Sequence, residues 1–209
     1  MKKLETFIKA IIAGGFIGIG GTVYLMTESK IVGALLFSVG LFSICTMNFN
    51  LFTGKVCYVF ENKLSYLIDL VIIWLGNLFG TFAVAFLESF TRIYPTLNAK
   101  AIELCKPKFA DEPISLIVLG FFCNILIYVA VDGYKNNKHE LGKYLAIIFG
   151  VVVFIMCGFE HCVADMYYIF VGNCITYAHA IECLILVTIG NILGGIFIPL
   201  LRKIIIKTI

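Results

Sequence analysis

Residues 151–172 read VVVFIMCGFEHCVADMYYIFVG, a run that is apolar enough for lipid but carries Glu160, His161 and Asp165 within six positions. A charged side chain at the centre of a bilayer costs at least about 2.5 kcal/mol. Ionisable residues inside a membrane segment therefore face a water-filled cavity or one another in almost every case, and they mark functional positions. The run predicts a membrane-spanning helix that is interrupted at such a position.

The whole chain has the composition of an integral membrane protein. Of its 209 residues, 61% are hydrophobic and 14% are charged, and the mean hydropathy is +1.00. A water-soluble domain carries about 25% charged residues. The apolar runs have the length of membrane helices rather than of barrel strands. The first run follows MKKLET without a small-residue cleavage site, so we interpret it as a retained helix and not as a signal peptide.

Six apolar segments can be placed along the chain. They cover about residues 7–26, 31–60, 65–87, 113–131, 144–170 and 181–201. The second is interrupted by TMNFNLFTGK at 46–55, and the fifth by CGFEHCVADM at 157–166. Polar residues and glycines at these places suit loops whose backbone groups need partners or a cavity. The sequence thus predicts an all-α membrane protein with a single transmembrane domain over residues 1–209.

A weak internal repeat relates the two halves. GNLFG at 76–80 recurs as GNILG at 190–194, and Phe37 and Cys45 recur as Phe149 and Cys157. The copies would cover about residues 7–87 and 113–201, with three segments each, so the second copy enters the membrane from the opposite face. Inverted repeats with a broken helix in each half are typical of transporters and channels, which bind their substrate at the breaks.

The distribution of positive charge predicts the orientation. With six spans both termini lie on one side, which would carry ten Lys and Arg residues, whereas the other side would carry five and Lys55 falls near an interruption. The positive-inside rule then places both termini in the cytoplasm. The ten are Lys2, Lys3, Lys9, Lys63, Lys135, Lys138, Lys143, Arg202, Lys203 and Lys207; the five are Lys30, Arg92, Lys100, Lys106 and Lys108.

Three functions are compatible with the polar residues of the fifth segment. The first is a pore lined by His161. The second is a divalent metal-ion transporter with His161 and Asp165 as ligands, because the two lie one helical turn apart. The third is a membrane enzyme that uses the pair of Glu160 and His161. Two ligands do not make a metal site and no nucleophile motif is visible, so we favour the pore and predict neither enzymatic activity nor a cofactor.

Two further features exclude other classes of function. The formal net charge of +3 is too small to indicate binding to nucleic acid. None of the eight cysteines forms a C-x-x-C pair. We interpret them as buried free thiols and not as metal ligands or disulfides.

Several motifs together resemble the formate/nitrite transporter family. They are LFTG at 51–54, GFEHCVADM at 158–166 and VTIGNILGG at 187–195, and they are joined by LGFFCN at 119–124 and FSVGL at 37–41. The resemblance covers essentially the whole chain. It implies an aquaporin-like fold and a homopentamer in the plasma membrane, in contact with the lipid bilayer. Each protomer would have its own pore for small monovalent anions such as formate, nitrite or hydrosulfide.

The resemblance also implies the residues of the pore. His161 matches the family's central histidine, Thr53 matches the threonine of the first helix break, and Lys108 matches a lysine that faces the pore. Asparagines of the family near the central region correspond to Asn124 and Asn191. Apolar positions that constrict the pore on either side of the histidine correspond to Phe37, Leu41, Leu51, Phe52 and Phe154. The position of Asp165 is usually asparagine in relatives.

From these residues we expect a pore that passes weak acids with the involvement of protons. Lys108 would attract the anion, His161 and Thr53 would bind it, and a proton from His161 or bulk water would let it leave as the neutral acid. Without the family spacing, Lys108 in CKPKFADEP is better explained by a surface ion pair with Asp111 or Glu112. Glu160 is expected to turn away and anchor freed backbone N–H groups of the broken helix.

Overall fold

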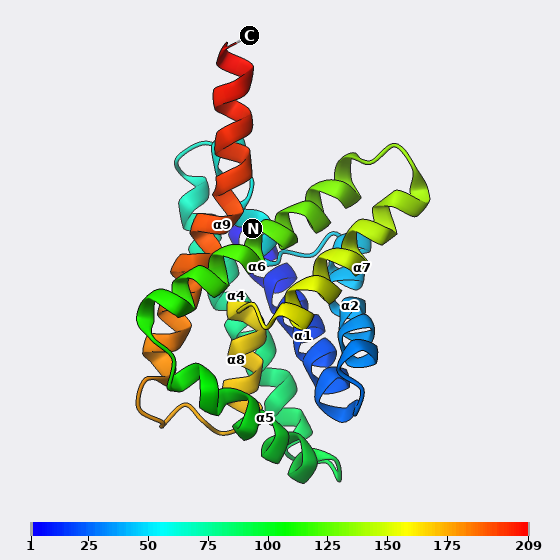
Figure 1. Ribbon diagram of the computed structural model, residues 1–209, viewed down its shortest axis with the longest axis vertical. Coiled ribbons are helices and arrows are strands. Elements are labelled where there is room, and N and C mark those ends of the chain that lie inside the picture. The colour runs from blue at the N-terminus through cyan, green and yellow to red at the C-terminus, as the bar shows by residue number, and fades with distance from the viewer. Residues whose placement is uncertain (1, 209) are drawn as a thin grey trace.

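The computed structural model describes residues 2–208, and every secondary-structure element in this range is helical (Figure 1). Five helices are long and apolar enough to cross a membrane, namely α1, α4, α6, α7 and α9. The elements are α1 Lys2–Met26, α2 Lys30–Thr46, α3 Phe52–Val56, the short 3₁₀ helix η1 Val59–Glu61, α4 Tyr66–Glu88, α5 Tyr94–Phe109, α6 Pro113–Asn136, α7 Glu140–Cys157, α8 Cys162–Val171 and α9 Ala180–Thr208.

The two predicted interruptions are confirmed as helix breaks. The chain leaves helical geometry at residues 47–51, between α2 and α3, and at residues 158–161, between α7 and α8. Each break contains a residue in the left-handed region, Asn48 with φ 55°, the second residue after α2, and Gly158 with φ 70°, the first residue after α7. Glycine and asparagine are the residues that adopt this conformation at least cost, which explains their presence at these two turns.

The two halves pack in the same way. Helix α1 packs against α4 and α6 packs against α9, in each case through glycines that allow close approach. A methyl group at Gly80 would lie 2.0 Å from the carbonyl oxygen of Ile11, and one at Gly194 would lie 2.0 Å from that of Phe121. Gly80 and Gly194 are the last glycines of the GNLFG and GNILG motifs, and they make equivalent contacts in the two halves. The repeat predicted from these motifs is therefore present in the fold.

The register of the repeat differs from part of the sequence prediction. The helix breaks are related by 110 positions, as Asn48 is to Gly158, and not by the 112 positions that relate Phe37 to Phe149. The exposed fractions of the two side chains also argue against pairing Phe37 with Phe149, because Phe37 is 2% exposed and Phe149 is 60% exposed. Matching by residue type alone misled here, since apolar residues occur at almost every position of these helices.

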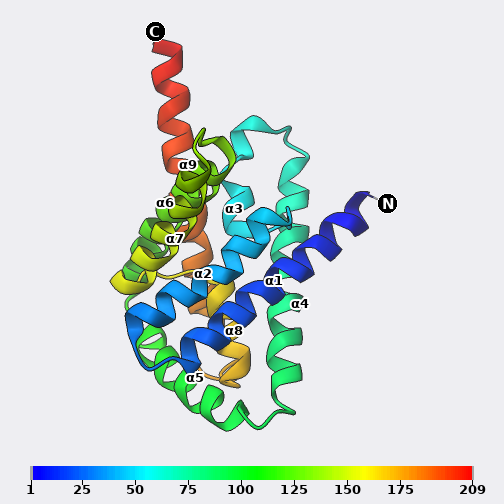
Figure 2. The ribbon, with the colours of Figure 1, turned by 90° about the vertical axis from the view of Figure 1, so that its right-hand side faces the viewer.

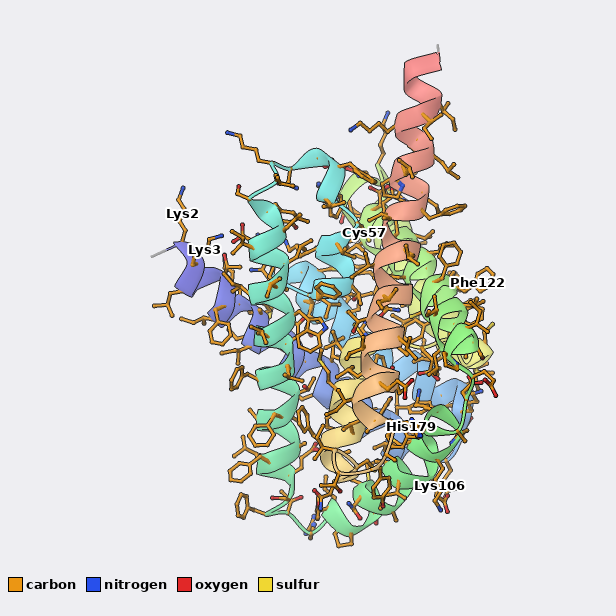
Figure 3. The ribbon with its side chains drawn as sticks, turned by 90° about the vertical axis from the view of Figure 1, so that its left-hand side faces the viewer. Lys2, Lys3, Cys57, Lys106, Phe122 and His179 are labelled. Carbon is orange, nitrogen blue, oxygen red and sulfur yellow. The ribbon has the colours of Figure 1, made fainter. Side chains whose placement is uncertain are left out.

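Both chain ends lie toward one end of the bundle. Lys2 and Lys3 lie near the upper end in Figure 3, whereas Lys106 and His179 lie at the lower end. The C-terminal part of α9 projects beyond the other helices at the upper end (Figures 1 and 2). It is tied to α6 by Arg202, whose guanidinium lies 3.0 Å from Asp132.

The polar stretch between the third and fourth spans contains a helix, α5, that the sequence analysis did not predict. This helix buries Leu97, Ala101 and Cys105, which recur every fourth residue on one face. Helix α5 packs against α8 at the lower end of the bundle (Figure 2). Its last turn carries Lys108 to the second helix break, and this placement decides the chemistry of the site.

Candidate functional site

The two broken helices meet at a buried hydrogen bond between Thr53 and His161. Thr53 Oγ1 lies 2.9 Å from His161 Nε2, and the two residues are 0% and 2% exposed. Thr53 stands in the first turn of α3, and His161 stands directly before α8. The structure therefore brings together the two polar residues that were predicted from opposite halves of the chain.

The hydrogen bonds of His161 fix its tautomer. Nδ1 accepts a hydrogen bond from the backbone N–H of Ala164 at 3.2 Å, so in a neutral ring the proton is on Nε2. Nε2 then donates to Thr53 Oγ1, and the hydroxyl proton of Thr53 remains available for another acceptor. The imidazole stacks against the ring of Phe154, with centroids 5.7 Å apart. The ring is thus held in one orientation from both sides.

Lys108 forms ion pairs across the second break. Its ammonium contacts Glu160 and lies 3.0 Å from Asp165 Oδ1. All three side chains are almost buried, with 12%, 8% and 1% exposure respectively. Lys108 belongs to α5, which is not one of the membrane-spanning helices. Burial alone would lower the pKa of Lys108, but the two carboxylates hold that pKa well above its ordinary value.

These ion pairs exclude one alternative and correct one expectation. Lys108 does not form the alternative surface pair with Asp111 or Glu112, since its partners are Glu160 in the break between α7 and α8 and Asp165 in the first turn of α8. Glu160 does not anchor backbone N–H groups with its side chain, because that carboxylate contacts Lys108. The backbone of Glu160 contributes to the break instead, by donating from its N–H to the carbonyl of Leu119 at 3.3 Å.

Asn124 and Asn191 lie at the core of the second half, where both are 0% exposed. Asn124 donates to the carbonyls of Thr53 at 3.1 Å and of Asn191 at 2.6 Å. The side-chain oxygen of Asn124, Oδ1, has no hydrogen-bond partner among the described residues. The side-chain amide of Asn191 bonds only to backbone groups around the break between α7 and α8. Its oxygen accepts from the N–H of Cys162, and its nitrogen donates to the carbonyls of Gly120 and Glu160.

Sequence reasoning missed the partner of Asn191 in the first half. Asn77 of α4 accepts from the N–H of Phe52 and donates to the carbonyls of Ala10 and Asn50. The sequence does contain a signal for the role of Asn77, because Asn77 and Asn191 occupy the same position in GNLFG and GNILG. A motif that recurs in both halves with an asparagine at its second position indicates a polar role inside an apolar helix.

Two cavities approach the Thr53–His161 pair from opposite ends of the bundle. The terminus-side cavity has a volume of about 750 Å³ and is bounded by η1, the end of α6 and the start of α7. The α5-side cavity has a volume of about 320 Å³ and is lined by residues that include Lys108, Glu160, Asp165 and His161. A polar centre between two cavities has the geometry of a passage that is closed in the middle.

The five predicted constriction residues are at most 4% exposed. Leu41 and Leu51 line the terminus-side cavity, whereas Phe37 and Phe154 line the α5-side cavity. The rings of Phe37 and Phe154 meet edge to face, with centroids 6.2 Å apart. Phe52 is buried and lines neither of these two cavities. Apolar side chains therefore border both cavities next to the polar centre.

The geometry gives no support to a metal site. Among the described residues, no three His, Cys, Asp or Glu side chains are grouped so that they could hold a metal ion. Asp165 turns to Lys108, while His161 turns to Thr53. All eight cysteines are free; six are buried, Cys45 is partly exposed and Cys157 is exposed.

Comparison with known proteins agrees with this arrangement. The chain is 27% identical to the formate channel FocA of Escherichia coli, over 92% of this chain and 82% of that protein. It is 28% identical to the formate-nitrite transporter of Plasmodium falciparum, over 92% of this chain and 74% of that protein. A solved pentameric formate channel with formate bound superposes with a TM-score of 0.83 and 25% identity, over 99% and 98% of the two chains.

The family model for formate/nitrite transporters matches residues 1–204 of the chain. This match covers both helix breaks, both cavities and all the ion pairs of Lys108. The family consists of channels and transporters and not of enzymes. The chain is a multi-pass membrane protein of the formate/nitrite transporter family.

Proposed function

We propose that this protein is a channel for small monovalent anions of weak acids, in the class of formate, nitrite and hydrosulfide. The observation that carries the proposal is the buried hydrogen bond between Thr53 and His161, which joins the two broken helices between two cavities. The relatives named as formate channels support the choice of anion class.

In this proposal the anion accepts a hydrogen bond from the hydroxyl of Thr53. His161 supports that donor, because its Nε2–H satisfies one lone pair of the same oxygen. The hydrogen bond from Ala164 N–H to Nδ1 favours the neutral ring, since a proton on Nδ1 would displace that donor. The proton that neutralises the anion then comes from water in the cavities rather than from His161.

The apolar residues on either side select for the neutral acid. Moving an anion through the rings of Phe37 and Phe154 without hydrogen-bond partners carries a large desolvation cost. The protonated acid crosses the same rings at far lower cost. Flux should therefore rise as the compartment that supplies the substrate is acidified, with protons moving together with the anion.

We further infer that the protein is a homopentamer in the plasma membrane, with both termini in the cytoplasm. The pentameric assembly of the solved formate channel supports the first inference. The distribution of Lys and Arg supports the second, since both termini lie at the end of the bundle that carries most of them. Lipid and neighbouring protomers would cover the apolar outer faces, such as that of Phe79, Phe82 and Phe86 on α4.

The proposal is tested by the pH profile of formate uptake into liposomes that contain the purified protein. His161→Ala should lower uptake at every pH, because His161 supports the hydroxyl that binds the anion. The rise on acidification should remain in this variant, because the proton comes from water. Uptake in His161→Ala that equals uptake in the unmodified protein over the whole pH range would contradict the role of the Thr53–His161 pair. Bound zinc after purification, without anion flux, would favour a metal-ion transporter instead.

A further inference from the structure

The terminus-side cavity contains an ammonium group that the proposed function does not use. Lys55 lies in α3, two residues after Thr53, and its side chain lines this cavity next to Leu51 and Gly54. The residue is partly buried. Among the described residues no ion pair involves Lys55. A partly buried ammonium without a carboxylate is unfavourable unless an anion can reach it.

The other charged groups of the cavity do not neutralise Lys55. Lys135 lies with its ammonium 4.3 Å from the centre of the Tyr58 ring, and it has no carboxylate partner among the described residues. Lys143 is paired with Glu140 at 2.5 Å. Glu61 is the one carboxylate among the residues that line the cavity. With Lys143 neutralised by Glu140, the cations Lys55 and Lys135 face one glutamate, so the wall of this cavity keeps a formal excess of positive charge.

The α5-side cavity has the opposite balance. Lys30 and Lys108 face three carboxylates there, those of Asp111, Glu160 and Asp165. The contrast is built into the repeat, because Lys55 in the first half stands at the position that Asp165 holds in the second, 110 residues later. The two ends of the passage therefore present opposite fields to an approaching ion.

We propose that Lys55, assisted by Lys135, forms a binding site for a small monovalent anion in the terminus-side cavity. The site holds the anion next to the constriction of Leu41 and Leu51, one step before the hydroxyl of Thr53. Its ligand is the ionised form of the same acid whose passage is proposed above, and in this respect the inference rests on the proposed function. Asn48, which also lines the cavity, offers a further amide donor.

A cysteine in the same cavity provides a direct test. Cys45 is partly exposed and lines the terminus-side cavity. Cys157 is exposed and the other six cysteines are buried, so Cys157→Ser leaves Cys45 as the accessible thiol. We would label this variant with an anionic and a cationic methanethiosulfonate reagent. The ratio of the two rates reports the local potential and is independent of the thiolate fraction, which both reagents share.

Lys55→Gln in this background should lower the ratio of anionic to cationic labelling at least about five-fold, because a focused charge changes local ion concentrations by about ten-fold or more. Lys55→Arg should retain the ratio of the parent protein. Lys63→Gln is the matched control, since Lys63 is exposed on the same end of the bundle and does not line the cavity. Formate should slow the anionic reagent in the parent and not in Lys55→Gln.

An unchanged labelling ratio in Lys55→Gln would overturn the proposal. If neither reagent reaches Cys45, formate uptake from the terminus side is measured instead. A loss of about five-fold or more in Lys55→Gln, with uptake retained in Lys55→Arg, would support the site. Equal uptake in Lys55→Gln and the parent protein would overturn it. Labelling does not depend on transport. A changed ratio in a protein that passes no anion would contradict the proposed function and leave the binding site standing.

Discussion

Asn77 on α4 and Asn191 on α9 make the same three hydrogen bonds at the two helix breaks. Each side-chain oxygen accepts from the first N–H of the helix that resumes, at Phe52 with 2.8 Å and at Cys162 with 2.9 Å. Each amide nitrogen donates to one carbonyl of the break and one of a neighbouring helix. Backbone groups freed within a membrane have no water to bind, so these two asparagines make the breaks possible.

Replacing Asn191 by alanine should destabilise the protein. The change leaves the N–H of Cys162 and the carbonyl of Glu160 without their partner, and each unsatisfied buried group costs about 1–3 kcal/mol. We expect a loss of at least about 2 kcal/mol in unfolding free energy, measured by denaturant titration in detergent. Asn136→Ala is the control, since the Asn136 amide bonds to Asp132 at the surface. Equal stability of the two variants would refute the anchoring role.

Close helix contact should make Gly194 far less tolerant than Gly15. A methyl group at Gly194 would lie 2.0 Å from the carbonyl oxygen of Phe121, so α6 and α9 would have to separate. At Gly15 the nearest atom, on Val84, would lie at an ordinary 3.7 Å. Gly194→Ala should lower the melting temperature strongly and Gly15→Ala should not. Similar melting temperatures would mean that the two helix pairs are not packed as described.

Asp165→Asn should raise formate uptake at neutral pH by several-fold. The substitution keeps the shape of the side chain and removes one of the two carboxylates that face Lys108, so the α5-side cavity becomes less negative and an anion enters it at lower cost. Asp69→Asn is the matched control, because Asp69 pairs with Lys3 at the opposite end of the bundle. Uptake that falls in Asp165→Asn would indicate that Asp165 itself is needed for passage.

Lys108→Met should destabilise the protein in addition to reducing uptake. It leaves Glu160 and Asp165 buried without their shared cation, and breaking a buried pair from one side costs about 3–5 kcal/mol. Combining Lys108→Met with Asp165→Asn should recover part of this stability, because only one carboxylate then remains. Denaturant titration of the two variants measures the difference. A double variant no more stable than Lys108→Met would contradict this account of the charges.

The sequence predicted the breaks because their polar residues interrupt otherwise apolar runs. Glu160, His161 and Asn50 have no place in a lipid-facing helix, so a function or a cavity had to be near them. It also predicted the meeting of Thr53 and His161, although only through the resemblance to a family. Residue pattern alone cannot bring two sites together that lie 108 positions apart.

The partners of Lys108 could not be predicted in the same way. Asp111 and Glu112 are its neighbours in sequence, and a local ion pair is the simplest reading of a polar stretch. Its partners are set by α5, which carries Lys108 back over the break between α7 and α8. The signal for this helix, with Leu97, Ala101 and Cys105 every fourth residue, was weak beside the charged residues around it.

The measurement that tests the central claim most directly compares Thr53→Val with Thr53→Ser. Valine keeps the shape of the side chain and removes the hydroxyl that joins the two broken helices, whereas serine retains it. Formate uptake into liposomes would be followed at two external pH values, with chloride as the control anion. We predict uptake that rises on external acidification in the unmodified protein and in Thr53→Ser, and a loss of about ten-fold in Thr53→Val, as for one hydrogen bond to a charged group. Equal formate uptake in all three proteins would contradict the account.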